Sequence, residues 1–307
     1  MAQIVLLDGG MGQELIHRFD GPTPPMWSSG VMAEQPELVE AVHRDYIAAG
    51  ARVIVVNSYS ATRPRLDRHG LIDRFEPLQK AALDIAQRAA KGHSGVHIAG
   101  GLSPLTGSYQ PELTQPFEDC LAQYREIVAL QKDCVSLFRV ETMSTTSEAV
   151  AAARAVAEVG MDAWIAFTVS DDDGTKLRSG ESLRAAAEAV VTEGAAAVLV
   201  NCSFPEAIDA SLPTIANLPV PIGAYANGFT SVAALKNDNT VDVLQAREDI
   251  TPGRYAEFAL GWIACGATII GGCCEVGPKH IGTVATAIGA AGHSIVSPIL
   301  SPERLSA

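Results

Sequence analysis

The 307-residue chain is rich in apolar residues (48%) and poor in charged ones (19%), a composition typical of a globular protein with a large core. Its formal charge of −13 argues against nucleic acid or an anionic membrane as a partner. The N-terminal residues lack the basic segment of a signal peptide, and no apolar run is long enough to predict a membrane span. We therefore expect a cytoplasmic protein whose six cysteines are thiols, ligands or core residues rather than disulfides.

Apolar strand-like runs alternate with alanine-rich helical segments along the chain. Eight runs are predicted as strands: 3–8, 52–57, 96–101, 135–141, 162–168, 196–202, 220–227 and 268–272. The helical segments are 35–51, 73–92, 116–133, 146–160, 181–194, 205–217, 252–266 and 277–292. Six of them close with a glycine suited to a left-handed C-terminal residue, namely Gly50, Gly92, Gly160, Gly194, Gly266 and Gly292. Nearly all-apolar strands indicate a parallel sheet covered on both faces, and eight βα units indicate a single (β/α)8 barrel.

No linker or change of composition divides the chain. We expect one barrel domain over residues 1–307, with residues from about 294 to 307 as a C-terminal tail. A doubly wound sheet is disfavoured, because no Gly-x-Gly-x-x-Gly follows the first strand. Two irregular segments, 18–34 and 228–250, are expected to emerge as long loops at the C-terminal ends of the strands.

Polar residues at those strand ends are the candidates for chemistry, because barrels place their active sites there. Cys202 ends the sixth strand, and Cys273 and Cys274 end the eighth, so the three thiols can converge. Three thiolates are suitable ligands for Zn²⁺ and leave the fourth tetrahedral position open. Adjacent strand residues point to opposite faces. We expect Gly271 and Gly272 to permit a turn that aims both thiols inward.

The cysteines also have less specific interpretations. Cys202 by itself is better explained as a small buried core residue, and we expect Cys120, Cys134 and Cys265 to be core residues. A disulfide between the neighbours Cys273 and Cys274 is disfavoured in a reducing compartment.

The motifs together resemble the homocysteine S-methyltransferase family. They are "LLDGGMGQEL" (6–15), "PMWSSGVMAEQPELVEAVHRDYIAAGARVIVVNSYSA" (25–61), "ETM" (141–143), "VNCS" (200–203), "YANG" (225–228) and "GGCCEVGPKHI" (271–281). The combination of "NCS" with a distant "GGCC" is the specific part. Members of this family are (β/α)8 barrels that bind zinc through three cysteines and methylate the thiol of homocysteine. The resemblance implies that Cys202, Cys273 and Cys274 are the zinc ligands and the catalytic centre.

The resemblance also implies substrate-binding residues. Glu141 matches the position that receives the amino group of homocysteine, and Asp8 matches a second residue near that substrate. We expect backbone N–H groups near Gly9, Gly10 or Met11 to hold the substrate carboxylate. The residues Asn57, Tyr59, Tyr225 and Asn227 are expected to position the donor or to support the groups around the metal.

Structural roles compete with these assignments. Asp8 is also a common turn residue, and Trp27 is either a loop anchor or a cation–π partner for an onium methyl group. Glu141 is alternatively an ion-pair partner of Arg139 or another basic residue. We take Arg139 as the weaker partner, on the expectation that neighbouring strand residues face opposite ways.

The expected function is zinc-dependent methyl transfer from an onium donor to the thiol of L-homocysteine, giving methionine. S-methylmethionine is the first expected donor, followed by S-adenosylmethionine or a betaine-like compound. A zinc barrel that methylates another thiol or acts as a hydrolase is one alternative, and a non-catalytic metal-binding barrel is the other.

Overall fold

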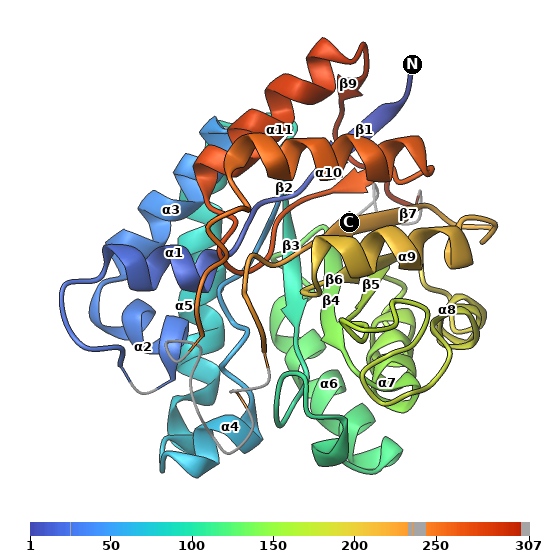
Figure 1. Cartoon of the computed structure of the whole chain (residues 1–307). Coiled ribbons are helices and arrows are strands. Elements are labelled where there is room, and N and C mark those ends of the chain that lie inside the picture. The colour runs from blue at the N-terminus through green and yellow to red at the C-terminus, as the bar shows by residue number, and fades with distance from the viewer. Residues whose placement is uncertain (25, 233–234, 236–243, 302–307) are drawn as a thin grey trace.

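The computed structural model describes residues 1–24, 26–232, 235 and 244–301. Its strands, arranged as Figure 1 shows, are β1 (Gln3–Leu6), β2 (Val53–Val55), β3 (His97–Leu102), β4 (Leu137–Met143), β5 (Ala163–Phe167), β6 (Ala197–Asn201), β7 (Ile222–Tyr225), β8 (Ile269–Ile270) and β9 (Ser294–Ile295). The first eight strands coincide with the eight that the sequence predicts.

The strands form one parallel sheet in the order β2-β3-β4-β5-β6-β7-β8-β1-β9. An isolated parallel bridge between Leu7 and Val53 joins the end of β1 to β2. Hydrogen bonds from Arg52 N to Leu6 O (2.7 Å) and from Asp8 N to Val53 O (3.0 Å) support the same closure. The predicted (β/α)8 barrel is therefore confirmed.

Helices surround the sheet (Figure 1). All eight predicted helical segments are present, as α3 (Pro36–Ala48), α5 (Phe75–Ala90), α6 (Phe117–Gln131), α7 (Thr146–Ala157), α8 (Leu183–Thr192), α9 (Pro205–Ile215), α10 (Pro252–Ala264) and α11 (Pro278–Ala290). All six predicted helix-terminal glycines have positive φ. Additional helices are α1 (Met11–Arg18), α2 (Trp27–Glu34), α4 (Arg63–Arg68) and the short 3-10 turns η1 (Ile72–Arg74) and η2 (Pro111–Leu113).

The helix α2 corrects the expectation that residues 18–34 are irregular. The eight-residue segment has little amphipathic character, since Ser28 and Ser29 are buried beside Val31 and Met32. The segment therefore lacks the apolar periodicity by which a helix is predicted from the sequence. In the other predicted loop, 228–250, residues 233–234 and 236–243 lie outside the described residues.

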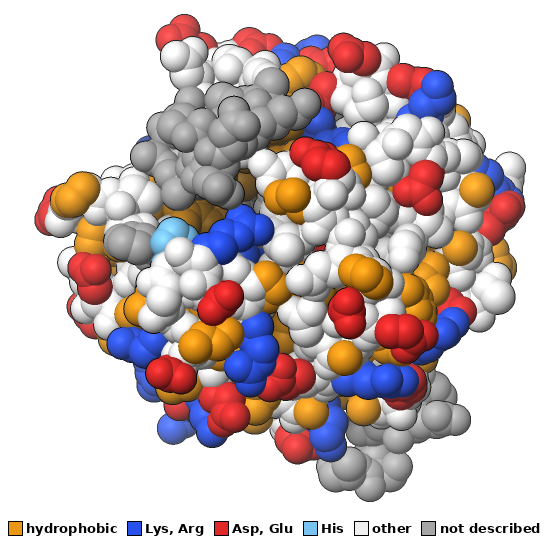
Figure 2. All heavy atoms as spheres, turned by 90° about the horizontal axis from the view of Figure 1, so that it is seen from below, with side chains coloured by type: hydrophobic (Ala, Val, Ile, Leu, Met, Phe, Trp, Pro, Cys, Tyr) orange, Lys and Arg blue, Asp and Glu red, His pale blue; other side chains and the backbone are white. Residues whose placement is uncertain are grey.

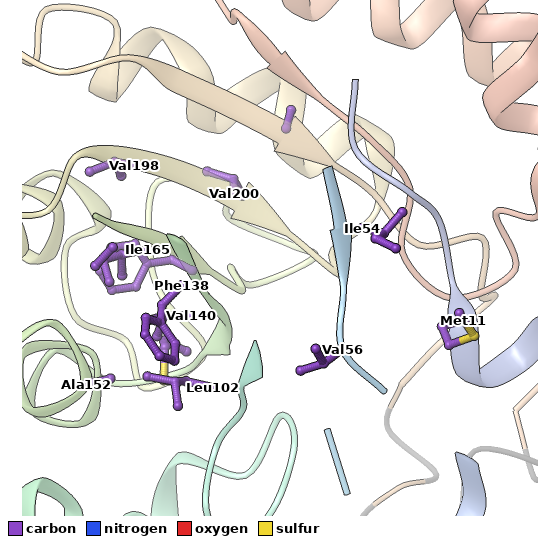
Figure 3. Close-up of a cluster of buried hydrophobic side chains, with 14 of the residues drawn as sticks. Met11, Ile54, Val56, Leu102, Phe138, Val140, Ala152, Ile165, Val198 and Val200 are labelled. Atoms are coloured by element: carbon purple, nitrogen blue, oxygen red, sulfur yellow. The ribbon is translucent and has the colours of Figure 1, made fainter. Parts of the chain in front are cut away.

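Alternate residues of the strands build two separate cores. One cluster of apolar side chains lies between the sheet and the helices, and Figure 3 shows Ile54, Phe138, Val140, Ile165 and Val198 among its members. The other includes Val5, Val53, Leu137, Trp164 and Leu199 and fills the barrel interior. Because Leu137, Arg139 and Glu141 alternate with Phe138 and Val140, these three side chains share the interior face of β4.

The segment after α11 runs along the opposite, N-terminal end of the barrel. β9 pairs in parallel with β1, with Gln3 opposite Ser294 and Ile4 opposite Ile295. Ser301 donates hydrogen bonds to the Asp162 carboxylate from its N–H (2.9 Å) and its hydroxyl (2.6 Å). Within the described residues, no helix combines the length and the apolar character needed to cross a membrane.

Candidate metal and substrate site

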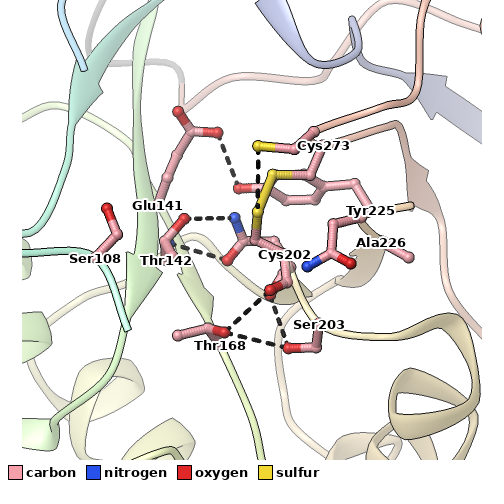
Figure 4. The surroundings of a disulfide bond; sticks show 12 residues. Ser108, Glu141, Thr142, Thr168, Cys202, Ser203, Tyr225, Ala226 and Cys273 are labelled. Atoms are coloured by element: carbon pink, nitrogen blue, oxygen red, sulfur yellow. Dashed lines mark hydrogen bonds between the residues drawn. A yellow bond between two sulfur atoms is a disulfide. The ribbon is translucent and has the colours of Figure 1, made fainter. Parts of the chain in front are cut away.

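Three cysteine side chains converge at the C-terminal ends of β6 and β8. The Sγ atoms of Cys202, Cys273 and Cys274 all lie within 4.8 Å of one another, and those of Cys202 and Cys274 are 4.0 Å apart. Cys202 and Cys274 are buried, and Cys273 is partly exposed. Figure 4 shows Cys202 and Cys273 approaching from separate segments of the chain. The convergence predicted from the sequence is therefore present.

A tight turn after β8 explains how two neighbouring cysteines reach one place. Val276 N donates to Cys273 O (3.0 Å), so the chain reverses across Cys274 and Glu275. Gly271 and Gly272 serve this turn differently from our expectation, because neither has a positive φ. Instead, a Cβ at Gly272 would overlap the Val276 side chain, and a Cβ at Gly271 would overlap that of Leu7. The two glycines allow close packing of the turn rather than an unusual backbone conformation.

In the structure, Cys202 and Cys273 are joined by a disulfide, while Cys274 is free. This differs from the expectation that all the cysteines are thiols. The physical reason is the convergence itself, since side chains close enough to share a metal are also close enough to be oxidised together. Metal binding at this site requires the disulfide to be reduced, because the ligand is the thiolate.

The donor set suits zinc. Two sulfur ligands of one tetrahedral zinc, each at about 2.3 Å, are about 3.8 Å apart, close to the separation of the Cys202 and Cys274 sulfurs. Burial raises the pKa of the Cys274 thiol to about 12. Without a cation, this thiol stays protonated at neutral pH, so a bound metal ion would supply the charge that the thiolate needs.

Asp8, Arg139 and Glu141 form a buried cluster of charges inside the barrel. Arg139 Nη1 donates to Asp8 Oδ1 (2.7 Å), and the backbone N–H of Val55 donates to Asp8 Oδ2 (2.8 Å). Arg139 Nε lies 2.8 Å from Glu141 Oε1 but is not aligned to donate a hydrogen bond to it. Tyr225 Oη donates to the same Glu141 oxygen (3.3 Å).

Our expectation that Arg139 is a weak partner for Glu141 is therefore wrong. The two residues are two positions apart, so they lie on the same face of β4, whereas the alternation argument applies only to immediate neighbours. Burial raises the pKa of both Asp8 and Glu141, and the Arg139 guanidinium opposes that rise. Two carboxylates and one guanidinium leave one formal negative charge in the cluster.

A cavity of about 500 Å³ opens next to the thiols. Nine of the twelve predicted site residues line it: Gly9, Gly10, Met11, Asn57, Tyr59, Glu141, Cys202, Cys273 and Cys274. Asp8, Tyr225 and Asn227 do not line it, although Asp8 and Tyr225 contact lining residues, Arg139 and Glu141 respectively. Asn57 Nδ2 donates to Ser28 O (3.1 Å), which ties the end of β2 to α2.

Most of the backbone N–H groups that we expected to bind the substrate carboxylate already donate to acceptors within the protein. Gly10 N donates to Val276 O (3.0 Å) and Met11 N donates to Gly9 O (2.9 Å). Of these three residues, the described structure leaves only the N–H of Gly9 without an acceptor. A Cβ on Gly10 would overlap Cys273 O, so this glycine permits the close approach of the "LDGG" segment to the cysteine turn.

Three residues that shape the cavity were not among the site residues predicted from the sequence. Tyr109, from the loop after β3, has its hydroxyl 2.9 Å from Cys202 Sγ. Burial raises the pKa of Tyr109 well above its usual value, so the phenol keeps its proton and donates a hydrogen bond to the sulfur. Arg65, on α4, and Arg139 also line the cavity. Arg139 could have been found from the sequence, because it lies two positions from Glu141 and therefore on the same face of β4. No local sequence pattern indicates that Tyr109 or Arg65 reaches the cavity.

Unusual backbone conformations gather around this cavity. Among the described residues, six non-glycine residues have positive φ, and five of them line the cavity: Met26, Trp27, Tyr109, Thr142 and Cys202. Such conformations cost energy and persist where the surrounding structure enforces them, often at functional sites.

The three cysteines outside the cluster were all expected to be core residues, but they differ in burial. Cys120 is buried, Cys134 is partly buried and Cys265 is exposed.

Figure 2 views the molecule from the side of these strand ends and shows basic side chains and a histidine gathered at one place on that face. The part of the cavity rim formed by α4 and the residues after it contributes Arg65, Arg68 and His69. Arg68 and His69 are exposed, and Arg65 is partly buried. The cavity therefore has a thiol end inside the barrel and a basic rim.

Comparisons with known proteins agree with this geometry. The family model described as homocysteine S-methyltransferase matches residues 5–288. A homocysteine S-methyltransferase from Escherichia coli is 30% identical, with 91% of this chain and 93% of that protein covered. The metallated crystal structure of the homocysteine methyltransferase MmuM from Escherichia coli is 26% identical, with a TM-score of 0.76 over 92% of this chain and 95% of that one. An oxidised form of the same protein also matches with a TM-score of 0.76, 26% identity and the same coverage.

The matched region includes the second half of β1, the strands β2 to β8, the three cysteines and the residues that line the cavity. The chain belongs to the homocysteine S-methyltransferase family, a family of methyltransferases.

Proposed function

We propose that this chain transfers a methyl group from an onium donor to the thiol of homocysteine, using zinc held by Cys202, Cys273 and Cys274. The observation that carries the proposal is the set of three sulfurs, within 4.8 Å of one another, beside a cavity of about 500 Å³ that also exposes Glu141. Zinc, when bound there, would favour the thiolate form of a substrate thiol at neutral pH.

The chain's own residues would align the reaction. Glu141, supported by Asp8, would receive the α-ammonium group of homocysteine, because the cluster with Arg139 retains one formal negative charge. The methyl carbon forms a bond to the substrate sulfur as its bond to the donor heteroatom breaks, and the donor heteroatom keeps that electron pair. Trp27 and Tyr59, whose rings meet edge to face at 6.2 Å, line the cavity where a cationic donor can contact them.

S-methylmethionine is the donor we propose first. S-adenosylmethionine and a betaine-like donor are the next candidates. The proposed site depends on reduced cysteines, which fits a reducing compartment such as the cytoplasm. The functional unit in this proposal is the single barrel over residues 1–307, with small molecules as its partners.

The test is a donor screen with reduced, zinc-loaded protein and homocysteine, with methionine formation as the readout. We expect methionine with at least one onium donor. A Cys265→Ser variant serves as the control, because Cys265 is exposed and does not belong to the cluster of three sulfurs. Absence of methionine with every donor would contradict the proposal.

Arg139 is the specific observation that makes another thiol a second candidate. Its guanidinium already pairs with both carboxylates that we assign to the ammonium group, so an acceptor thiol without an amino group would leave neither carboxylate without a cationic partner. The same screen with 3-mercaptopropionate in place of homocysteine separates the two acceptors. Faster methylation of 3-mercaptopropionate would support the second candidate.

A further inference from the structure

The basic rim of the cavity contrasts with the rest of this acidic protein. Arg65, Arg68 and His69 line the cavity together with Arg139, while Glu141 is the one carboxylate among the described lining residues. The whole chain carries a formal charge of −13. Arg139 is already paired with Asp8 and Glu141, so Arg65 on α4 is the lining arginine to consider as a partner for a ligand that carries negative charge.

Arg65 is the cation best placed to bind that charge. Its Nη2 donates to Pro104 O (2.9 Å) and Ser108 Oγ (3.2 Å), and its Nε lies 3.3 Å from Pro104 O. Its guanidinium also packs over the Tyr59 ring, 5.4 Å from the centroid. These contacts hold one side of the planar group and fix its orientation before any ligand arrives.

Arg65 lacks the carboxylate partner that comparable arginines have. Arg63 on the same helix pairs with Glu126, Arg139 pairs with Asp8, and Arg178 pairs with Asp171. Among the described residues, no carboxylate lies within ion-pair distance of Arg65. Burial lowers the pKa of Arg65 from its ordinary value, as expected for a cation shielded from water, yet an arginine remains charged at neutral pH. A held, partly buried guanidinium with no carboxylate in direct contact, on which Glu148 acts only from beyond ion-pair distance, is suited to a ligand carboxylate.

A line of contacts connects Arg65 to the cysteine cluster. Tyr59 Oη is 2.8 Å from Ser108 Oγ, and Ser108 precedes Tyr109, whose hydroxyl reaches Cys202 Sγ at 2.9 Å. Trp27, Tyr59 and Tyr109 all line the same cavity as Arg65 and the three cysteines. Aromatic rings attract an onium cation, so this wall suits the charged centre of a methyl donor.

We propose that Arg65 binds the carboxylate of the methyl donor, whose onium centre lies along the aromatic wall facing the thiols. This inference rests on the proposed methyl transfer and assigns a specificity-determining residue to the donor. It predicts that zwitterionic donors react well and that onium compounds without a carboxylate react poorly. Arg65 acts on donor binding and takes no part in breaking or forming bonds.

The test compares two donors that differ only in the anion, namely dimethylsulfoniopropionate and its methyl ester. For the acid, Arg65→Met should raise the donor KM about 10- to 100-fold, the size expected for losing a charge-assisted hydrogen-bonded pair. For the ester, the same variant should change KM less than about 3-fold, because no ionic contact is lost. Arg65→Lys, which keeps the charge without the planar fork, should give an intermediate loss with the acid.

Arg63→Met is the matched control, since Arg63 lies on the same helix, contacts Glu126 and Phe75 and does not line the cavity. It should leave the KM of both donors unchanged. Equal effects of Arg65→Met on acid and ester would overturn the inference. A rise in the homocysteine KM with an unchanged donor KM would also overturn it, because the anion at Arg65 would then be the acceptor's carboxylate.

Calorimetric binding provides a readout that does not depend on turnover. Without homocysteine the donor has no acceptor, so its affinity for zinc-loaded protein is measured directly. Wild type should bind the acid more tightly than the ester, and Arg65→Met should remove that preference. If no donor methylates homocysteine but this preference is present, the proposed reaction fails while the carboxylate site stands. If methylation occurs without the preference, only the carboxylate site fails.

Discussion

The cysteine cluster and the Asp8–Arg139–Glu141 cluster lie at the same end of the barrel, yet they differ in how they are held together. The cysteines have no fixed charge to balance them, and burial keeps Cys274 protonated unless a cation is present. The three charged residues already contain their own cation, which is buried between two carboxylates. One cluster is completed by a ligand from solution, whereas the other is completed by the protein, so removing a residue should affect metal binding in the first and folding in the second.

The largest expected effect is at the cysteines. Cys274→Ser leaves the two other sulfurs but removes the third ligand, so zinc affinity and methyl transfer should each fall by at least about 100-fold. Zinc content by mass spectrometry and methionine formation measure the two effects. The melting temperature of the metal-free variant should stay close to that of metal-free wild type. Retention of zinc and activity would mean that the cluster is not a metal site.

Arg139→Met should act on stability instead. The substitution leaves Asp8 and Glu141 buried without their shared cation, and breaking such a pair costs about 3–5 kcal/mol in the free energy of unfolding. Urea denaturation of metal-free protein measures this change. Arg125→Met is the control, because Arg125 forms an exposed pair with Glu158 and its removal should not change stability measurably. A fully stable Arg139→Met protein would contradict our description of the charge cluster.

The pH dependence of stability should sharpen the same comparison. Burial raises the pKa of Asp8 and Glu141 above their ordinary values of 3.8 and 4.5, so the folded chain binds these protons more tightly than the unfolded chain. Stability from these groups is therefore present below the unfolded pKa values and is lost as pH rises through the higher folded values. Without Arg139 the folded pKa values rise further. The stability gap between wild type and Arg139→Met should widen from about pH 4 to pH 7, and a constant gap would contradict this account.

Tyr109→Phe should give the smallest effect. It removes the hydroxyl that donates to Cys202 Sγ and keeps the ring that lines the cavity. Loss of one hydrogen bond worth about 0.5–1.5 kcal/mol should lower kcat/KM about 2- to 10-fold. Steady-state kinetics with homocysteine measure the change, and an unaltered melting temperature would separate it from misfolding. An unchanged kcat/KM would show that this contact has no role in the reaction.

The sequence allowed the barrel to be predicted because its signals are local. All eight strands are short apolar runs, and six helix ends carry the glycine that a positive φ favours. The cysteine cluster was predictable for a related reason, since barrel topology brings the ends of β6 and β8 together once the strands are placed. In both cases the type of a residue and its position in a strand or helix were sufficient for the prediction.

The parts that were missed depend on contacts between distant segments. Tyr109 and Arg65 reach the cavity from loops and a short helix whose paths no periodicity describes. The helix α2 was missed because it buries serines beside apolar residues. Arg139 was misjudged for a simpler reason, since positions two apart on a strand share a face. The disulfide required knowing how closely Cys202 approaches Cys273.

The most direct test of the central claim is zinc binding by the same protein in its oxidised and reduced forms. If Cys202, Cys273 and Cys274 form the metal site, equilibrium dialysis should give about one zinc per chain after reduction and almost none while the Cys202–Cys273 disulfide is intact. Re-reduction of the oxidised sample should restore binding. Equal zinc binding in both forms, or no binding in the reduced form, would contradict the account.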